Sequence, residues 1–200
     1  MLNRTALIKT DERRERIETV LKQKQPSLTV VLENIHDPHN VSAILRTCDA
    51  VGVMEVHLVY TFESFPEISK ASSVSASKWM SIVKHKSFED CSSYLKSKNF
   101  LIAASHLDIY SKTHDEIDFT ENVALVFGNE QRGITEEYLR FCDFSFRIPM
   151  HGMIQSLNVS VAAAVCLFEA EKQFRISGRY DSIQLDKDVF DNKLKNWLLK

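Results

Sequence analysis

Apolar runs of six or seven residues recur along this chain and alternate with segments of helical periodicity. Five runs are predicted to be strands: Leu28–Glu33, Met54–Tyr60, Phe100–His106, Asn122–Gly128 and Phe144–Pro149. The helices predicted between them are Val41–Val51, Ser87–Lys98 and Thr135–Cys142. Continuous apolar strands are typical of parallel sheets, because helices bury both of their faces. The sequence therefore predicts an α/β fold, with a mainly parallel sheet and helices on both faces.

The segment Ile148–Ala170 changes abruptly from an irregular loop to an apolar helix. Pro149 and Gly152 interrupt regular structure, and Ser156 and Asn158 are residue types that start helices. The small apolar residues that follow have almost no polar face, which predicts a helix inside the protein. A polar helix start beside such a loop would suit a small polar ligand, although many buried helices that bind nothing begin in the same way.

Length and composition point to a single domain. The chain has 200 residues, of which 44% are hydrophobic, enough for one substantial core. No stretch reaches the ~18 apolar residues of a membrane span, and the first residues lack the apolar core of a signal peptide. We therefore expect a cytoplasmic protein that does not use a membrane.

The cysteines give no sign of a disulfide framework or a metal site. Cys48, Cys91, Cys142 and Cys166 are far apart and form no CxxC pair, and no set of histidines has metal-ligand spacing. Reduced core thiols, with no bound metal, are the prediction.

Charge is distributed unevenly along the chain, whose net charge is only −2. Residues 1–25 carry seven Lys and Arg against four Asp and Glu, and residues 171–200 carry seven against five. Basic ends on an acidic body suggest that terminal helices, predicted at Thr10–Lys24 and Lys187–Lys200, meet an anionic partner; the alternative is that they are solvated faces. We expect a basic helical extension at 1–25, a main domain at 26–178 and a helical extension at 179–200.

The first of three candidate ligand-binding loops leads into the helix Val41–Val51. Ligands of parallel sheets bind outside the carboxyl ends of the strands, where such loops lie. A buried apolar stripe on this helix would leave Ser42, Arg46 and Asp49 on its other face. With Asn40 at the N-cap, Arg46 would lie one turn into the helix and could hold a phosphate. Alternatively, Arg46 forms an ion pair with Asp49 on a solvent-exposed surface.

The second loop follows the strand Asn122–Gly128, and the third is the junction Ile148–Ser160. Glycine in the second loop would let the backbone approach a ligand, and Glu130 and Arg132 bring opposite charges to the strand end. A tight turn with a surface ion pair is the plain alternative. The chain has no dinucleotide fingerprint, P-loop or Ser-His-Asp motif, which removes the commonest nucleotide-binding and hydrolase classes.

These three segments resemble the motifs of the SpoU (TrmH) branch of the SPOUT RNA methyltransferases. They read NVSAILRT at Asn40–Thr47, GNEQRGI at Gly128–Ile134 and IPMHGMIQSLNVSVAA at Ile148–Ala163, in the family's order. The short N-terminal region and the helical extensions look most like members that methylate guanosine 18 of tRNA.

The resemblance implies a SPOUT fold with a deep trefoil knot in its C-terminal half, and a homodimer with the active site at the subunit interface. It also implies S-adenosylmethionine as cofactor and tRNA as partner. Residues at the family's cofactor-binding positions are Ser105, His106, Gly128, Ile148, Met150 and Leu157.

The family's functional side chains match Asn40, Arg46, Glu130, Ser156 and Asn158. Because a guanidinium has no lone pair to accept a proton, we expect Arg46 to fix an RNA phosphate and polarise the ribose hydroxyl. Arg13, Arg14 and Arg16 of the basic extension are further candidates for RNA contact. The other four side chains would position Arg46, the ribose and the loops, or have purely structural roles.

Two other functions stay open at this point. The target could be another RNA, such as rRNA or the wobble ribose of tRNA. The chain could also be a non-catalytic RNA-binding protein that keeps the fold.

Overall fold

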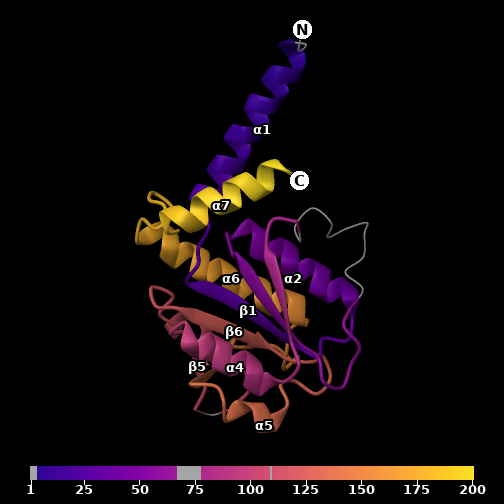
Figure 1. Cartoon of the computed structure of the whole chain (residues 1–200). Helices are drawn as coiled ribbons and strands as arrows, with labels where there is room; N and C mark the ends of the chain where they lie inside the picture. The colour runs from indigo at the N-terminus through magenta and orange to yellow at the C-terminus, as the bar shows by residue number, and fades with distance from the viewer. Residues whose placement is uncertain (1–3, 67–77, 109) are drawn as a thin grey trace.

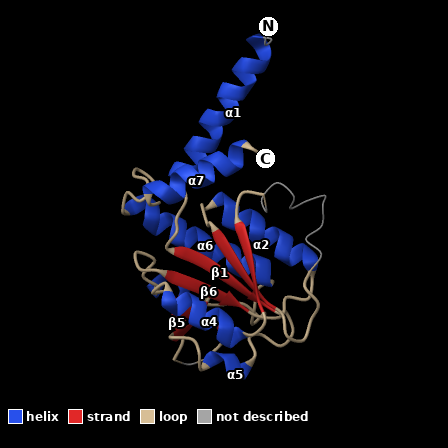
Figure 2. Cartoon of the chain, viewed as in Figure 1, coloured by secondary structure: helices blue, strands red, loops and turns tan. Residues whose placement is uncertain are grey.

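A computed structural model describes residues 4–66, 78–108 and 110–200. Its centre is one sheet with helices on both faces (Figures 1 and 2). The described strands are β1 (Leu28–Glu33), β2 (Glu55–Val59), β3 (Ser81–His85), β4 (Leu101–Ser105), β5 (Lys112–Thr113), β6 (Val123–Phe127) and β7 (Phe144–Arg147). They lie in the order β3-β2-β1-β6-β4-β7-β5, and every pairing is parallel. The predicted α/β class is confirmed.

Helices cover both faces of this sheet. The helices are α1 (Arg4–Lys22), α2 (Pro38–Ala50), α4 (Phe88–Ser97), α5 (Glu136–Leu139), α6 (Val159–Ile176) and α7 (Lys187–Leu198), with a 3-10 turn at His114–Glu116. Val30 of β1 packs in the core with α2 and α6, whereas Val31 packs on the other face with α4. Side chains alternate across a strand, so each apolar run serves both layers.

The start of α2 differs from the prediction. Asp37, not Asn40, is the N-cap, and its side chain accepts a hydrogen bond from the His39 amide at 2.8 Å. Pro38 occupies the first helical turn, where its fixed φ favours the helix and no amide hydrogen is needed. The predicted apolar stripe is buried, but Ser42, expected on the outer face, is buried as well.

The helix α6 is not enclosed, contrary to the prediction. Ala163, Cys166, Leu167, Ala170 and Phe174 are buried, but Val161, Phe168 and Ile176 are 48%, 53% and 72% exposed. The apolar sequence therefore belongs to a helix that has one face in the core and, in the single chain, one face exposed to solvent.

The terminal helices pack on each other. Figure 1 shows α1 projecting from the body, with α7 across its base. The helix predicted from Thr10 begins earlier, and one face of its final turns is buried: Ile17 and Leu21 pack with Leu185 and Trp197. Beyond the helix end, Lys24 is fully buried.

The remaining comparisons with the sequence concern the edge of the sheet, the loop after β2, the thiols and possible membrane spans. The edge strand β3 was missed, because SIVKH has no continuous apolar run. The sequence also predicts an irregular loop at Thr61–Lys78; its residues 67–77 lie outside the described ones, and residues 61–66 have no regular structure. All four cysteines are free thiols, as predicted. Among the described helices, none combines the length and apolarity needed to cross a membrane.

Candidate active site

The loops that follow β4, β6 and β7 enclose a cavity of about 400 Å³. All six residues at the predicted cofactor positions line it: Ser105, His106, Gly128, Ile148, Met150 and Leu157. Backbone-rich loops contribute most of its wall, and Val159 and Ala162 of α6 add apolar surface. The size falls in the range of small-molecule sites.

The fold itself requires a glycine at position 128, which the sequence did not reveal. A Cβ atom at this position would lie only 2.3 Å from the backbone of Gly133 and Ile134. The strand end and the returning loop therefore cross in direct contact, and Gly133 turns the loop at a φ of +70°. The missing side chain is needed for this crossing before any ligand is considered.

Three side chains from the three motifs form a hydrogen-bonded chain, which we call the loop cluster: Asn40, Glu130 and Asn158. Asn40 donates from Nδ2 to Glu130 Oε1 at 2.7 Å. Asn158 donates from Nδ2 to Asn40 Oδ1 at 3.2 Å. The cluster thus links the start of α2, the loop after β6 and the start of α6.

Glu130 is held by the backbone as well. Its carboxylate accepts hydrogen bonds from the amides of His36, at 2.9 Å, and Asp37, at 3.2 Å. Partial burial alone would raise the pKa of Glu130, but the bonds from Asn40, His36 and Asp37 bring this pKa below its ordinary value. The side chain is therefore an anion that fixes the entry to α2.

Asn158 and Ser156 have different surroundings although both were predicted to start the helix. Asn158 is the N-cap of α6 and accepts a hydrogen bond from the Ser160 amide at 2.8 Å. Its structural role is therefore present alongside its contact with Asn40. Ser156 lies two residues before the cap, is exposed and lines the cavity.

Arg46 stands apart from the other predicted side chains. Because α2 begins at Pro38, Arg46 lies about 12 Å of helix rise beyond the first residue, in the third turn and not the first. The expected help from the helix N-terminus is therefore absent. Asp49 is taken by the Nζ of Lys24 at 3.0 Å, so the surface pair with Arg46 is not formed either. Arg46 is exposed, and it is not among the described residues that line the cavity.

Two asparagines that the sequence analysis missed shape the surrounding loops. Asn129 is buried, donates to the carbonyl of Asn34 at 2.8 Å and accepts from the amide of Gln131 at 3.0 Å. Asn34 has a φ of 48° and accepts from the amides of the loop after β2. The available signal was an Asn at a strand end, a residue type that tolerates this left-handed conformation.

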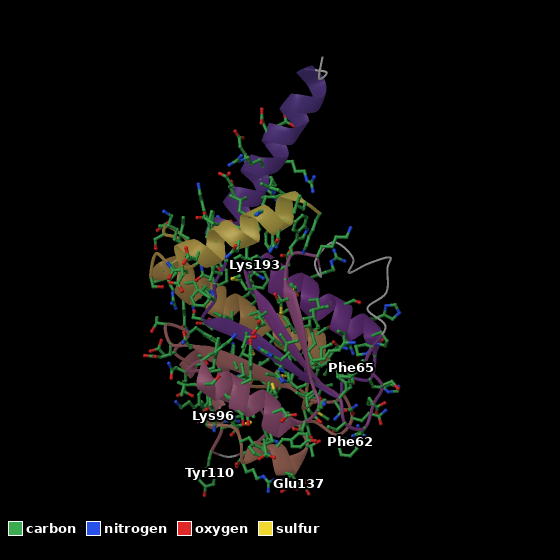
Figure 3. The ribbon with its side chains drawn as sticks, in the orientation of Figure 1. Phe62, Phe65, Lys96, Tyr110, Glu137 and Lys193 are labelled. Carbon is green, nitrogen blue, oxygen red and sulfur yellow. The ribbon has the colours of Figure 1, made fainter. Side chains whose placement is uncertain are left out.

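Basic and aromatic side chains lie around these loops and on α1. Arg132 contacts Glu63 at 3.4 Å and lies over the ring of Phe62, which projects from the loop after β2 (Figure 3). Arg132 thus pairs with Glu63 of another loop and not with Glu130 of its own loop. On α1, Arg13, Arg14 and Arg16 are exposed, and Arg14 pairs with Glu18 at 2.8 Å.

Comparison with known proteins places this geometry in a family. The SpoU rRNA Methylase family matches residues 27–168. The tRNA (guanosine(18)-2'-O)-methyltransferase of Thermus thermophilus is 46% identical over 192 residues, which cover 96% of this chain and 98% of the relative. The enzyme of the same name from Escherichia coli is 44% identical over 165 residues, covering 82% and 72%.

Solved structures agree with the sequence matches. The A. aeolicus TrmH/SpoU tRNA modifying enzyme superposes with a TM-score of 0.88 at 35% identity, over 95% of this chain and 96% of that chain. An AdoMet-bound rRNA methyltransferase from Sinorhizobium meliloti superposes with a TM-score of 0.66 at 29% identity, over 78% and 59%. The three motifs, the parallel sheet and these matches have one common explanation: this chain belongs to the SpoU methylase family.

Proposed function

We propose that this protein transfers the methyl group of S-adenosylmethionine to the ribose 2'-OH of guanosine 18 in tRNA. The observation that carries the proposal is the cavity of about 400 Å³, lined by all six expected cofactor residues and joined to the loop cluster through Glu130 and Asn158. Relatives 44–46% identical to this chain are named for this reaction.

The lining fits S-adenosylmethionine. Its apolar part, including Ile148, Met150 and Leu157, suits the adenine and the methionine stem, and the loop backbones offer donors and acceptors for the polar groups. The bound cofactor supplies an electrophilic methyl group on a sulfonium. Asn158, Ser156 and Glu130, on the same wall, would orient the loops around it.

Arg46 is the group proposed to act on the RNA. Transfer joins the methyl group to the 2'-oxygen, and the hydroxyl proton leaves. A guanidinium stays charged and cannot accept that proton, so Arg46 would bind a phosphate beside the target and polarise the 2'-OH. Positioning of the hydroxyl would supply most of the rate. Asn40 and Glu130 would keep the α2 helix, and with it Arg46, in place.

A homodimer would complete the site. In one chain Arg46 lies apart from the cavity, so we propose that Arg46 of the partner subunit faces it. Two features support such an interface: the exposed apolar face of α6, with Phe168, and the apolar side chains of Met153 and Ile154, which are exposed beside the cavity. Small residues on α6 would allow close packing. We also propose that the segment after β7 forms the trefoil knot of the family.

The terminal helices are proposed to bind the tRNA body. Arg13, Arg14 and Arg16 are exposed on a helix that projects from the sheet (Figure 1), where an anionic partner can reach them. In this proposal residues 1–25 and 179–200 act as extensions of a methyltransferase domain at 26–178.

The test is methylation of unmodified tRNA transcripts by the purified protein with methyl-labelled S-adenosylmethionine. A transcript with adenosine at position 18 is the matched control. We expect label in the guanosine transcript, mapped to the ribose of nucleotide 18, and little label in the control. Label only at the wobble ribose or only in rRNA would overturn the choice of target. Absence of cofactor binding in calorimetry would overturn the methyltransferase function.

A further inference from the structure

A second cluster of polar side chains lies away from the cavity, between the edge of the sheet and α4. His57 of β2, His85 at the end of β3 and Cys91 of α4 are all buried, and we call them the histidine cluster. Their ligand atoms all lie within 4.8 Å of one another. The sequence predicts no metal site, because the three residues are separated by 28 and 6 positions without a ligand motif. Parallel pairing of β2 with β3 places His57 and His85 on neighbouring strands.

The internal hydrogen bonding of this cluster is incomplete. His57 Nδ1 lies 2.9 Å from His85 Nε2, so one ring donates to the other. The other ring nitrogen of His57, Nε2, is buried and has no hydrogen-bond partner in the described residues. Glu55 Oε1 lies 3.5 Å from this nitrogen, which is long for a hydrogen bond. An incompletely paired imidazole in the core is a costly arrangement that needs a reason.

The position of Glu55 decides which nitrogen of His57 carries the proton. A bare lone pair on Nε2 would face a carboxylate, which is unfavourable, so the proton belongs on Nε2 and the lone pair on Nδ1. That lone pair points at His85. A carboxylate beside one ring nitrogen of a histidine, with the other nitrogen presented as a lone pair, is the usual arrangement around a metal-bound histidine.

We propose that His57 Nδ1, His85 Nε2 and the Cys91 thiolate bind a zinc ion. Two imidazoles and one thiolate suit a divalent ion of borderline softness, and zinc is the common intracellular choice for such a set. Binding forms one Zn–S and two Zn–N bonds, and the thiol proton passes to solvent. The fourth ligand is a water molecule on the side where His85 approaches the surface.

Small movements are enough to form this site. Donor atoms of a tetrahedral zinc site lie about 3.4 to 3.6 Å apart, given bond lengths of about 2.0 to 2.3 Å. The two nitrogens must therefore separate by about 0.5 Å, and the thiol must approach by at most about 1.5 Å. When no metal is bound, the hydrogen bond between His57 and His85 satisfies the two nitrogens that would bind the ion.

The proposed site lies apart from the cavity. None of its three residues is among the described residues that line the cavity. A bound ion would fasten the first turns of α4 to β2 and to the edge strand β3, whose side chains are otherwise only partly buried.

The test uses tag-free, full-length protein stripped with a chelator and titrated with Co²⁺ and then Zn²⁺. Wild-type protein should bind one Co²⁺ per chain, with a thiolate-to-cobalt charge-transfer band and the strong visible bands of tetrahedral cobalt, and Zn²⁺ should displace it. Cys91→Ser should lose the charge-transfer band. Glu55→Gln should weaken binding about 10- to 100-fold, as expected for loss of the group behind a ligand.

Cys142→Ser is the matched control, because Cys142 is a nearby thiol outside the histidine cluster and should leave the spectrum unchanged. If Cys91→Ser fails to fold, His85→Gln at the strand end replaces it, and its loss of the tetrahedral spectrum supports the site. Absence of stoichiometric Co²⁺ or Zn²⁺ binding by the wild-type protein overturns the proposal. So does a charge-transfer band that persists in folded Cys91→Ser or that disappears in Cys142→Ser.

Discussion

The loop cluster and the histidine cluster are both sets of polar side chains gathered by neighbouring strands, but they satisfy their polar atoms differently. Glu130 lies at the surface and accepts three hydrogen bonds from Asn40 and two backbone amides. His57 lies in the core and leaves one ring nitrogen without a partner in the described residues.

The difference shows what each cluster can do without a ligand. The hydrogen bonds of the loop cluster are complete in the single chain, so the cluster fixes loop positions, and in the proposed function the reactive groups come from the cofactor, the RNA and Arg46. In the histidine cluster the two rings pair only with each other, and a metal ion would bridge them to Cys91. We therefore expect changes in the first cluster to alter catalysis, and changes in the second to alter stability.

The largest effect is expected from Arg46→Ala. Loss of the guanidinium that is proposed to bind a phosphate should lower the rate of methylation by at least about 100-fold, the cost of removing one major electrostatic group. Binding of S-adenosylmethionine, measured by calorimetry, should change little, because Arg46 does not line the described cavity. Arg14→Ala on α1 is the control and should retain turnover at saturating tRNA. Near wild-type turnover of Arg46→Ala would contradict the assignment.

Removal of metal should affect only the histidine cluster. At a zinc concentration of about 100 times Kd, binding stabilises the folded state by about 2.7 kcal/mol. For a chain of this length, stripping the metal should therefore lower Tm by about 5 to 10 °C in calorimetry. Cofactor affinity should stay the same. An unchanged Tm, or an equal drop in folded His85→Gln, would break the proposed division between the clusters.

A smaller effect is expected from Glu130→Gln. The amide keeps the shape but presents an NH₂ group to donors, so the bonds from Asn40 and His36 weaken. We expect the methylation rate to fall about 10-fold, or about 1.4 kcal/mol in activation free energy, with a small but measurable fall in Tm. Glu136→Gln, at an exposed position of α5, is the control. A Tm drop as large as the activity loss would mean that Glu130 acts chiefly on stability.

The smallest effect concerns pH. The folded-state pKa of Glu130 is below its ordinary value, so its contribution to stability is fully present above about pH 4.5 and is lost as the pH falls through the lower folded-state value. The difference in Tm between wild type and Glu130→Gln should be constant from about pH 8 to about pH 5 and shrink in stronger acid. A difference that disappears near about pH 6 would show that the hydrogen bonds do not lower this pKa.

Much of the fold could be predicted because it depends on local pattern. The strands around Val30 and Leu125 read as continuous apolar runs, and the α2 stripe followed helical spacing. Errors had two causes. The start of α2 was missed although its signal, Asp37 as N-cap before Pro38, is local, whereas β3 is a strand only because β2 offers it an edge.

The residues of the candidate site could be predicted from the sequence, but the position of Arg46 relative to the others could not. Four of the six predicted cofactor residues and the whole loop cluster fall in three short motifs, and Ser105 and His106 end the apolar run Phe100–His106, so all of them could be named from sequence. That Arg46 would stand apart from them could not, because its place depends on where α2 begins and how α2 packs on α6.

The sequence by itself determined the class of fold, the family and the side chains offered at the strand ends, since each is written in short contiguous segments. Only the tertiary structure decided that α6 keeps an open apolar face, that Lys24 holds Asp49 and that His57, His85 and Cys91 meet. These depend on which distant segments become neighbours, and strand order and helix packing set that without any local signal.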